Sequence, residues 1–247
     1  MFNSILSLIF PIQSIQKLIA NEDDKKLLEN IETEIFTKSL LFLGDNSLFK
    51  TSLLFQSCLS SASSNRSKDA VYICKQELSS LPLFVHNMPK PDSGDLLKQI
   101  KFKYLKTSEE LIEYFAGIHL NKSAPSIIVI EDIIDYINIQ KYEQELDCIR
   151  QSMLLSAHIK SAIDFLNLSN DCVCIIGSRQ CDEENNRLKQ IFDSVCCVKT
   201  IDKDILYELN YKNCTNPSRE FRLKFENRDS DLCLYNISLS EKTFVEQ

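Results

Sequence analysis

Glycine is scarce in this sequence. The chain has 247 residues and only four glycines, Gly44, Gly94, Gly117 and Gly177, whereas about 7% is usual. Because glycine is so scarce, a glycine between a predicted strand and a predicted helix is a stronger indication of a functional position. Gly44 lies at such a junction, and it is therefore the first candidate for a functional position.

An excess of basic residues is also missing. Lys and Arg number 28 against 35 Asp and Glu, which gives a formal net charge of −7. This balance excludes a protein that is held on nucleic acid by its overall charge alone. Any contact with nucleic acid must be local or shared with a partner.

Paired cysteine spacing is missing, although the chain has ten cysteines. No C-x-x-C pair occurs, and the three histidines are isolated from the cysteines. Cys172 and Cys174 lie on one apolar, strand-like run, and Cys196 and Cys197 lie on another. We therefore expect buried, reduced thiols in an intracellular protein rather than zinc ligands or disulfides.

Long hydrophobic runs are missing as well. The apolar start, MFNSILSLIFPIQSIQKLIA, lacks the positive charge and the cleavage pattern of a signal peptide. Pro11 interrupts it well short of a membrane-spanning length. We expect residues 1–37 to form a helical, amphipathic extension that docks on the body of the protein or on a partner, without membrane contact.

Strand-like and helix-like segments alternate along the rest of the chain. Short apolar runs predict strands at 40–43, 70–74, 100–105, 126–131 and 172–177. Periodic apolar residues predict helices at 22–37, 50–60, 108–119 and 143–167. This alternation indicates an α/β core over residues 38–247, with a mainly parallel sheet flanked by helices. The pattern after residue 195 indicates an antiparallel, strand-rich C-terminal end.

The stretch GDNSLFKTS resembles the phosphate-binding signature G-x-x-x-x-G-K-[ST]. In such a loop, backbone N–H groups wrap the phosphates, lysine neutralises them, and the hydroxyl holds magnesium. Phe49 stands where the second glycine belongs. A left-handed backbone there would cost about 1–2 kcal/mol, and the ring would hold the loop away from the phosphates. The candidate nucleotide-binding residues are Gly44, Asp45, Asn46, Ser47, Leu48, Phe49, Lys50, Thr51 and Ser52.

The run PSIIVIED places Glu131 and Asp132 at the end of a buried apolar strand. An NTPase has an acidic residue at this place, which meets magnesium through water. The alternative is that Asp132 caps the helix that follows it. Together with the lysine loop upstream, the acidic pair favours a nucleotide site, and the predicted magnesium ligands are Thr51, Glu131 and Asp132.

The run SGDLLKQIKFKYLKTSEELIEYFAGIHLNKSAPSIIVIEDIIDYI, residues 93–137, resembles the SWIM-domain-protein-associated ATPase of the Shu complex. That family consists of RecA-like recombinase paralogues. The similarity extends over roughly residues 39–240 and includes DCVCIIG and EFRLKFEN in matching order. The first 37 residues lie outside it.

The resemblance implies a RecA-like P-loop NTPase core. It also implies a role in homologous-recombination DNA repair in the nucleus. The implied partners are a SWIM-domain zinc protein, a RecA-family recombinase or its paralogues, and single-stranded DNA. The implied cofactors are ATP and Mg²⁺, with no zinc in this chain.

Two further site positions follow from the resemblance. Recombinases of this fold place a catalytic glutamate just beyond the second strand, where this chain has Gln76 followed by Glu77. A glutamine cannot take a proton from water, so the sequence does not assign the residue that acts as general base. Arg179 and Gln180 fall where the fold often places a residue that senses the terminal phosphate.

The candidate DNA contact is LKQIKFKYLK, residues 97–106. Ile100, Phe102 and Tyr104 share one face of the predicted strand. The lysines that lie on the other face or flank the strand are Lys98, Lys101, Lys103 and Lys106. They form either a basic stripe that contacts phosphates or the solvated side of a half-buried strand whose Tyr104 packs in the core. A second candidate consists of Arg219, Arg222 and Lys224.

Three functions are therefore open. The first is a recombination mediator with single-stranded-DNA-stimulated ATPase activity. The second is a nucleotide-independent scaffold in the same complex, with a degenerate phosphate loop. The third is an unrelated P-loop phosphotransferase, against which no lid-like arginine cluster follows the loop.

Overall fold

A single sheet organises the described part of the chain. The computed structural model describes residues 5–10, 38–45, 48–78, 82–91, 94–121, 123–137, 145–169, 172–179, 188–189, 191–202, 205–213 and 219–241. Their ten-stranded sheet has the order β3-β10-β9-β8-β7-β1-β6-β5-β2-β4. The predicted extension helix 22–37 lies outside the described residues.

The parallel half of the sheet has five short strands, four of them mostly apolar and buried. They are β1 (Ser39–Leu43), β2 (Ala70–Cys74), β4 (Ile100–Tyr104), β5 (Ile127–Ile130) and β6 (Val173–Ser178). From β7 to β4, all five neighbouring pairs of strands are parallel. Strand β1 pairs with both β6 and β7, β5 pairs with β6 and β2, and β2 pairs with β4. The predicted parallel strands are confirmed, and no strand end differs from the prediction by more than one residue.

The antiparallel half follows along the chain. Its strands are β7 (Ser194–Asp202), β8 (Leu206–Asn213), β9 (Arg219–Arg228) and β10 (Asp231–Glu241). The short strand β3 (Phe84–Val85) pairs with the start of β10 and closes this edge. The predicted strand-rich, antiparallel end is confirmed.

The helices differ from prediction at their ends. They are α3 (Leu48–Ser64), α4 (Gly94–Lys98), α5 (Ser108–Ala116) and α6 (Glu145–Ser169), with 3₁₀ turns η1 (Ile5–Leu8), η2 (Ile118–Leu120) and η3 (Ile133–Tyr136). Helix α3 runs past its predicted end because Ser61 is buried there and its hydroxyl lies 2.7 Å from that of Ser126. The predicted helix 108–119 is interrupted at Gly117, which caps α5.

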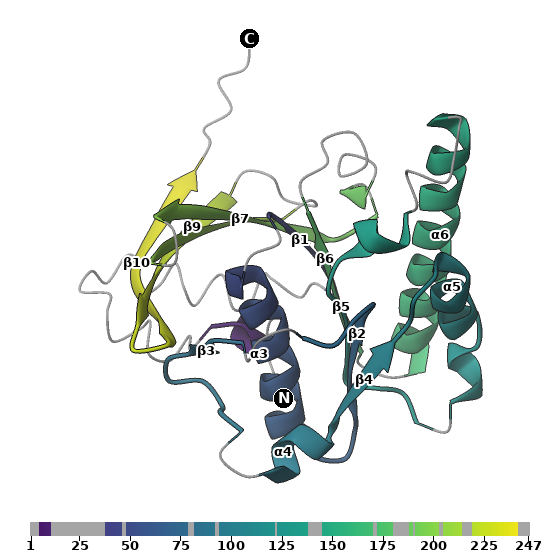
Figure 1. Ribbon diagram of the computed structural model, residues 1–247, viewed down its shortest axis with the longest axis horizontal. Helices are drawn as coiled ribbons and strands as arrows, with labels where there is room; N and C mark the ends of the chain where they lie inside the picture. The colour runs from purple at the N-terminus through teal and green to yellow at the C-terminus, as the bar shows by residue number, and fades with distance from the viewer. Residues whose placement is uncertain are drawn as a thin grey trace.

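Helices cover both faces of the sheet. Helix α3 packs on one face, α5 and α6 pack on the other, and the antiparallel strands curve around α3 (Figure 1). Two hydrophobic cores result, one on each side of the parallel strands. The carboxyl ends of β1, β5 and β6 therefore meet beside the first turn of α3, where this class of sheet binds ligands.

The described start of the chain belongs to the core. Leu8, Ile9 and Phe10 are buried, and the rings of Phe10 and Phe225 are 5.5 Å apart. This part of the predicted extension therefore docks on the body of the protein. Of the described helices, none combines the length and the apolar character needed to span a membrane.

The described cysteines are free thiols, and most of them are buried. The buried ones are Cys58, Cys74, Cys172, Cys174 and Cys196. Burial raises the pKa of Cys74 and of Cys172 to about 12. The predicted burial of the strand cysteines is confirmed for Cys172, Cys174 and Cys196, whereas Cys197 is only half-buried.

Candidate functional site

Gly44 directly follows β1, in a place that has no room for a side chain. Its N–H donates to the carbonyl oxygen of Ser178 at 3.0 Å. A Cβ atom on Gly44 would lie 2.8 Å from the carbonyl oxygen of Val198 and 2.9 Å from its Cβ. Glycine thus lets the chain leave the sheet between β6 and β7 and turn toward α3.

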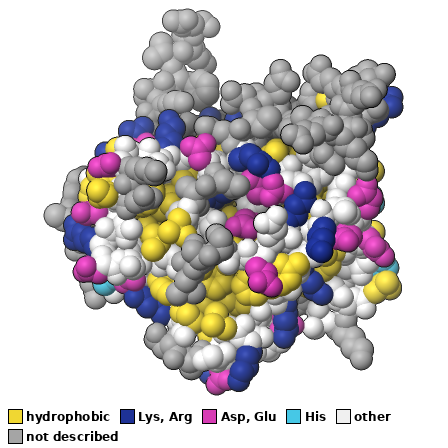
Figure 2. All heavy atoms as spheres, in the orientation of Figure 1, with side chains coloured by type: hydrophobic (Ala, Val, Ile, Leu, Met, Phe, Trp, Pro, Cys, Tyr) yellow, Lys and Arg dark blue, Asp and Glu magenta, His cyan; other side chains and the backbone are white. Residues whose placement is uncertain are grey.

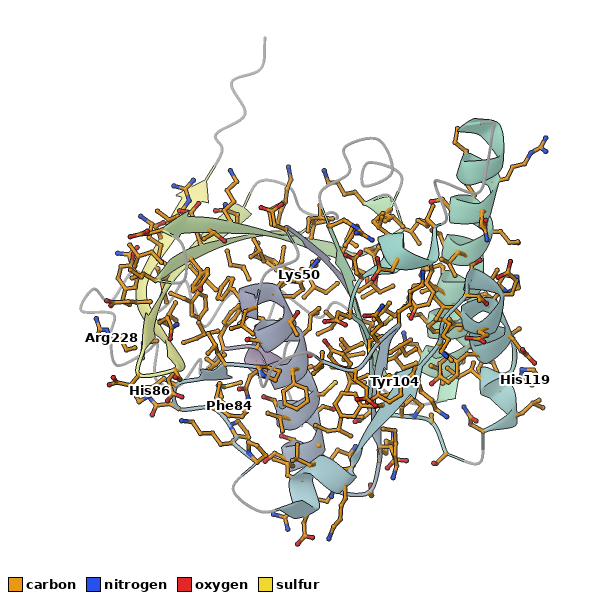
Figure 3. All side chains as sticks on the ribbon, in the orientation of Figure 1. Lys50, Phe84, His86, Tyr104, His119 and Arg228 are labelled. Atoms are coloured by element: carbon orange, nitrogen blue, oxygen red, sulfur yellow. The ribbon has the colours of Figure 1, made fainter. Side chains whose placement is uncertain are left out.

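Lys50 lies in the first turn of α3, beside the ends of β1 and β6 (Figure 3). Its side chain is fully buried. The Nζ atom lies 3.3 Å from the carbonyl oxygen of Gly44 and 3.7 Å from Oδ2 of Asp132. Burial lowers the pKa of the Lys50 ammonium, and the Asp132 and Glu131 carboxylates oppose this shift. A cation is thus held where a phosphate loop places one.

Thr51 and Glu131 meet across the gap between α3 and β5. The Thr51 hydroxyl donates to Oε1 of Glu131 at 3.2 Å. Burial raises the pKa of Glu131, while this hydrogen bond and the Lys50 charge oppose the shift. A hydroxyl beside a carboxylate supplies the hard oxygen ligands that Mg²⁺ prefers.

Gly177 fixes the position of this carboxylate, and sequence reasoning assigned it no role. A Cβ atom on Gly177 would lie 2.0 Å from the carbonyl oxygen of Glu131. Strand β6 therefore approaches the end of β5 more closely than any side chain would allow. A glycine inside an apolar strand is a known sign of close backbone approach, and it was the available signal.

Asp132 has both of the roles that its sequence position suggested as alternatives. Its Oδ1 accepts the N–H of Ile134 at 3.0 Å and so caps η3. Its Oδ2 faces Lys50 at 3.7 Å and Nε of Arg179 at 3.6 Å. Burial raises the pKa of Asp132, and the two cations oppose the shift. The cap is confirmed, and magnesium binding stays a prediction.

Arg179 joins a second group of charges beside the site. Its backbone N–H lies 3.3 Å from Oδ1 of Asp132, and its guanidinium contacts Asp135. Lys75 reaches the carbonyl oxygen of Asp135 and lies 5.6 Å from the centroid of the Tyr136 ring. Sequence reasoning missed Asp135 and Lys75, because nothing in the spacing indicates that η3 folds back on the end of β2.

Phe49 does not stand in the phosphate loop as an obstacle. It is helical, and it is not among the described non-glycine residues with positive φ. Its buried ring stacks on the Tyr207 ring, with 4.3 Å between the ring centroids, and its centroid lies 5.4 Å from that of the Phe225 ring. The expected backbone cost at Phe49 is therefore wrong, since α3 begins at Leu48 and its first turn directs the ring into the core.

The remaining candidate residues of the loop differ in exposure and in their contacts. Asp45 is exposed, and Leu48 is half-exposed at the start of α3. The Ser52 hydroxyl accepts the N–H of Leu83 at 2.8 Å, so its side chain holds the segment before β3. Asn46 and Ser47 lie outside the described residues.

Gln76 and Glu77 follow β2 and are exposed. Among the described residues, no hydrogen bond or ion pair joins either side chain to Lys50, Thr51 or Glu131. Their catalytic role stays a prediction. Gln180 lies outside the described residues.

The candidate DNA-contact lysines lie around β4, the edge strand of the sheet. They are exposed, and Lys98 pairs with Asp95 at 2.7 Å. Tyr104 is 46% exposed, and its ring is nearly parallel to that of Phe102. The expectation that Tyr104 packs in the core is wrong, because β4 is the edge strand among the described residues and leaves the ring partly exposed. Figure 2 shows hydrophobic side chains gathered over the lower part of this face, with Lys and Arg side chains around them.

The second candidate group lies on β9. Arg222 is exposed, and its Nε lies 3.1 Å from Oδ1 of Asn210 and 3.5 Å from Oε1 of Glu208. Lys224 is half-buried on the same strand, and the side chain of Arg219 lies outside the described set. Of this group, Arg222 is engaged with side chains of the neighbouring strand β8.

Comparison with known proteins identifies the fold. No protein-family model and no curated protein matches the sequence. A solved structure described as the crystal structure of the RadB recombinase is similar, with a TM-score of 0.61 over 83% of this chain and 95% of that chain. The sequence identity is 12%. The predicted fold class is confirmed: the chain has an α/β, RecA-like core, with a mainly parallel sheet flanked by helices and antiparallel C-terminal strands.

Proposed function

We propose that this protein is a homologous-recombination DNA repair factor with a nucleotide site at Lys50. In this proposal it pairs with a SWIM-domain zinc protein, binds single-stranded DNA, and promotes or stabilises filaments of a RecA-family recombinase. The observation that carries the proposal is the convergence of Lys50, Thr51, Glu131 and Asp132 at the carboxyl ends of the parallel strands. It acts in the nucleus, as the family resemblance implies.

The residues of the site fit ATP and Mg²⁺. Lys50 and the positive end of α3 suit the outer phosphates. The Thr51 hydroxyl and the Glu131 carboxylate suit the metal ion, whereas Asp132 faces Lys50 and Arg179. Bound Mg²⁺ would neutralise charge on the phosphates. The ring of Phe49 packs in the core, on Tyr207 and Phe225, and not on Lys50 or Thr51.

A nucleotide-independent scaffold in the same complex is the second candidate. One observation favours it: Lys50 is already buried against Gly44 and Asp132. The exposed Gln76, which stands where a general base is expected, adds to it. No observation on the described residues favours the unrelated phosphotransferase.

The test is ATP hydrolysis by the purified chain, with and without single-stranded DNA. We expect slow turnover that DNA stimulates and that Lys50→Ala lowers by about tenfold or more, because the phosphates lose their cation. Lys160→Ala, which removes a surface lysine paired with Asp164, is the matched control and keeps full turnover. Folded protein that binds a SWIM-domain partner but never exceeds the Lys50→Ala rate would establish the scaffold instead.

A further inference from the structure

The phosphate-loop lysine already has an anionic neighbour inside the protein. Lys50 is fully buried, and Oδ2 of Asp132 lies 3.7 Å from its Nζ. This acid is not the one directly after β5, which is Glu131 and which bonds Thr51 instead. The strand end thus carries two carboxylates with different neighbours, one at the hydroxyl and one at the ammonium.

Asp132 is held so that one oxygen points at Lys50. Its Oδ1 accepts N–H groups from Ile134 at 3.0 Å and from Arg179 at 3.3 Å. Its Oδ2 accepts no hydrogen bond within the described residues. The attraction between Oδ2 and Lys50 is therefore that of two buried charges without a hydrogen bond, which a better-placed anion can displace.

Arg179 gives Asp132 a second cation. Its Nε lies 3.6 Å from the same Oδ2. A buried carboxylate that lost its only partner would be strongly destabilising. With Arg179 at this distance, Asp132 has a cation beside it other than Lys50.

We infer that Asp132 is a built-in competitor for the phosphates of the nucleotide, and that it sets the affinity of the site for them. The inference rests on the proposed nucleotide site. In the free protein Asp132 holds Lys50, and a bound nucleotide takes Lys50 over while Asp132 turns to Arg179. The nucleotides favoured by this exchange are those whose terminal phosphate brings the most negative charge to Lys50, so a triphosphate displaces Asp132 better than a diphosphate.

The test compares Asp132→Ser with wild type in the binding of a fluorescent N-methylanthraniloyl-ATP with Mg²⁺. Serine keeps an oxygen that can cap η3 but removes the charge. We expect Asp132→Ser to bind the probe about tenfold more tightly, because the phosphates no longer compete with a buried carboxylate. Asp135→Ser, which removes an equal charge from the neighbouring partner of Arg179, is the matched control and changes the affinity by less than about twofold.

A second measurement needs no nucleotide. The unfolding equilibrium is measured in urea for Lys50→Met, Asp132→Ser and the double variant. If the two side chains act on each other, the double variant is more stable than the sum of the single effects predicts, by about tenfold in the equilibrium constant. Additive effects would overturn the pairing.

The outcomes separate this inference from the proposed function. Wild type that binds the probe as tightly as Asp132→Ser overturns the competitor and leaves the nucleotide site standing. Binding by Asp132→Ser alone supports the competitor and identifies the wild-type chain as a scaffold. If neither protein binds the probe, both the nucleotide site and the competitor are wrong.

Discussion

At the residue scale, a single missing methyl group positions the acidic end of β5. Strand β6 runs so close to β5 that a Cβ atom on Gly177 would lie 2.0 Å from the carbonyl oxygen of Glu131. The obstacle is backbone, which cannot rotate aside as a side chain can.

We therefore expect Gly177→Ala to lower the free energy of unfolding by about 1–3 kcal/mol or more, as overpacking does. Urea denaturation measures this change, and Gly94→Ala, whose Cβ would meet nothing within 4 Å, is the control. Equal stability of the two variants would contradict the role given to Gly177.

The residue scale also shows the limit of pattern reading. Lys50, Thr51 and Glu131 were predictable because the phosphate-loop spacing and the strand end each follow from local sequence. The contacts of Asp132 with Arg179 were not, because they join the ends of β5 and β6 across 47 residues of chain. Local patterns identify which side chains carry chemistry, but the register between distant strands decides which of them meet.

At the element scale, the first turn of α3 belongs to both the site and the core. Phe49 stacks on Tyr207 of β8, while the next residue, Lys50, reaches the strand ends.

We expect Phe49→Gly, which restores the glycine of the signature, to lower the free energy of unfolding by about 3–5 kcal/mol, because it leaves a cavity where a buried ring was. Leu48→Gly, at a half-exposed position of the same turn, costs only about 1 kcal/mol. Thermal and urea unfolding measure both. A stable Phe49→Gly variant with faster ATP turnover would show that the ring is an obstacle after all.

This element explains why the sequence misled at Phe49. The signature assumes that the residue before the lysine lies against phosphate, and a phenylalanine there signals a lost site. The antiparallel strands β8 and β9 curve around α3 and offer the ring a hydrophobic partner instead. The sequence predicted those strands, but not that their sheet would bend back over the first turn of the helix.

At the scale of the whole molecule, one aromatic cluster joins the start of the chain and strand β9 to the first turn of α3. Phe10 contacts Phe225 of β9, and Phe225 contacts Phe49 of α3. Residues 8–10 therefore belong to the same packed unit as the α/β core, although the sequence pattern divided the chain at residue 37. The class of fold was predictable, since alternating apolar strands and helices admit few topologies. The docking of the first residues was not, because an apolar terminus fits a partner surface as well as it fits its own core.

This packing predicts how the molecule unfolds. We expect a single transition, and we expect Phe10→Ala to shift all of it by about 3–5 kcal/mol, since the buried ring contributes to the core that holds α3 and β9. Tyr235→Ala, which removes an aromatic ring that is 42% exposed on β10, is the control and costs far less. Circular dichroism and tyrosine fluorescence followed in the same urea series give the measurement, because the chain has no tryptophan to mask the tyrosines. A Phe10→Ala variant that unfolds with wild-type stability would mean that the start of the chain is a separate unit, whose packing adds nothing to the body that carries the site.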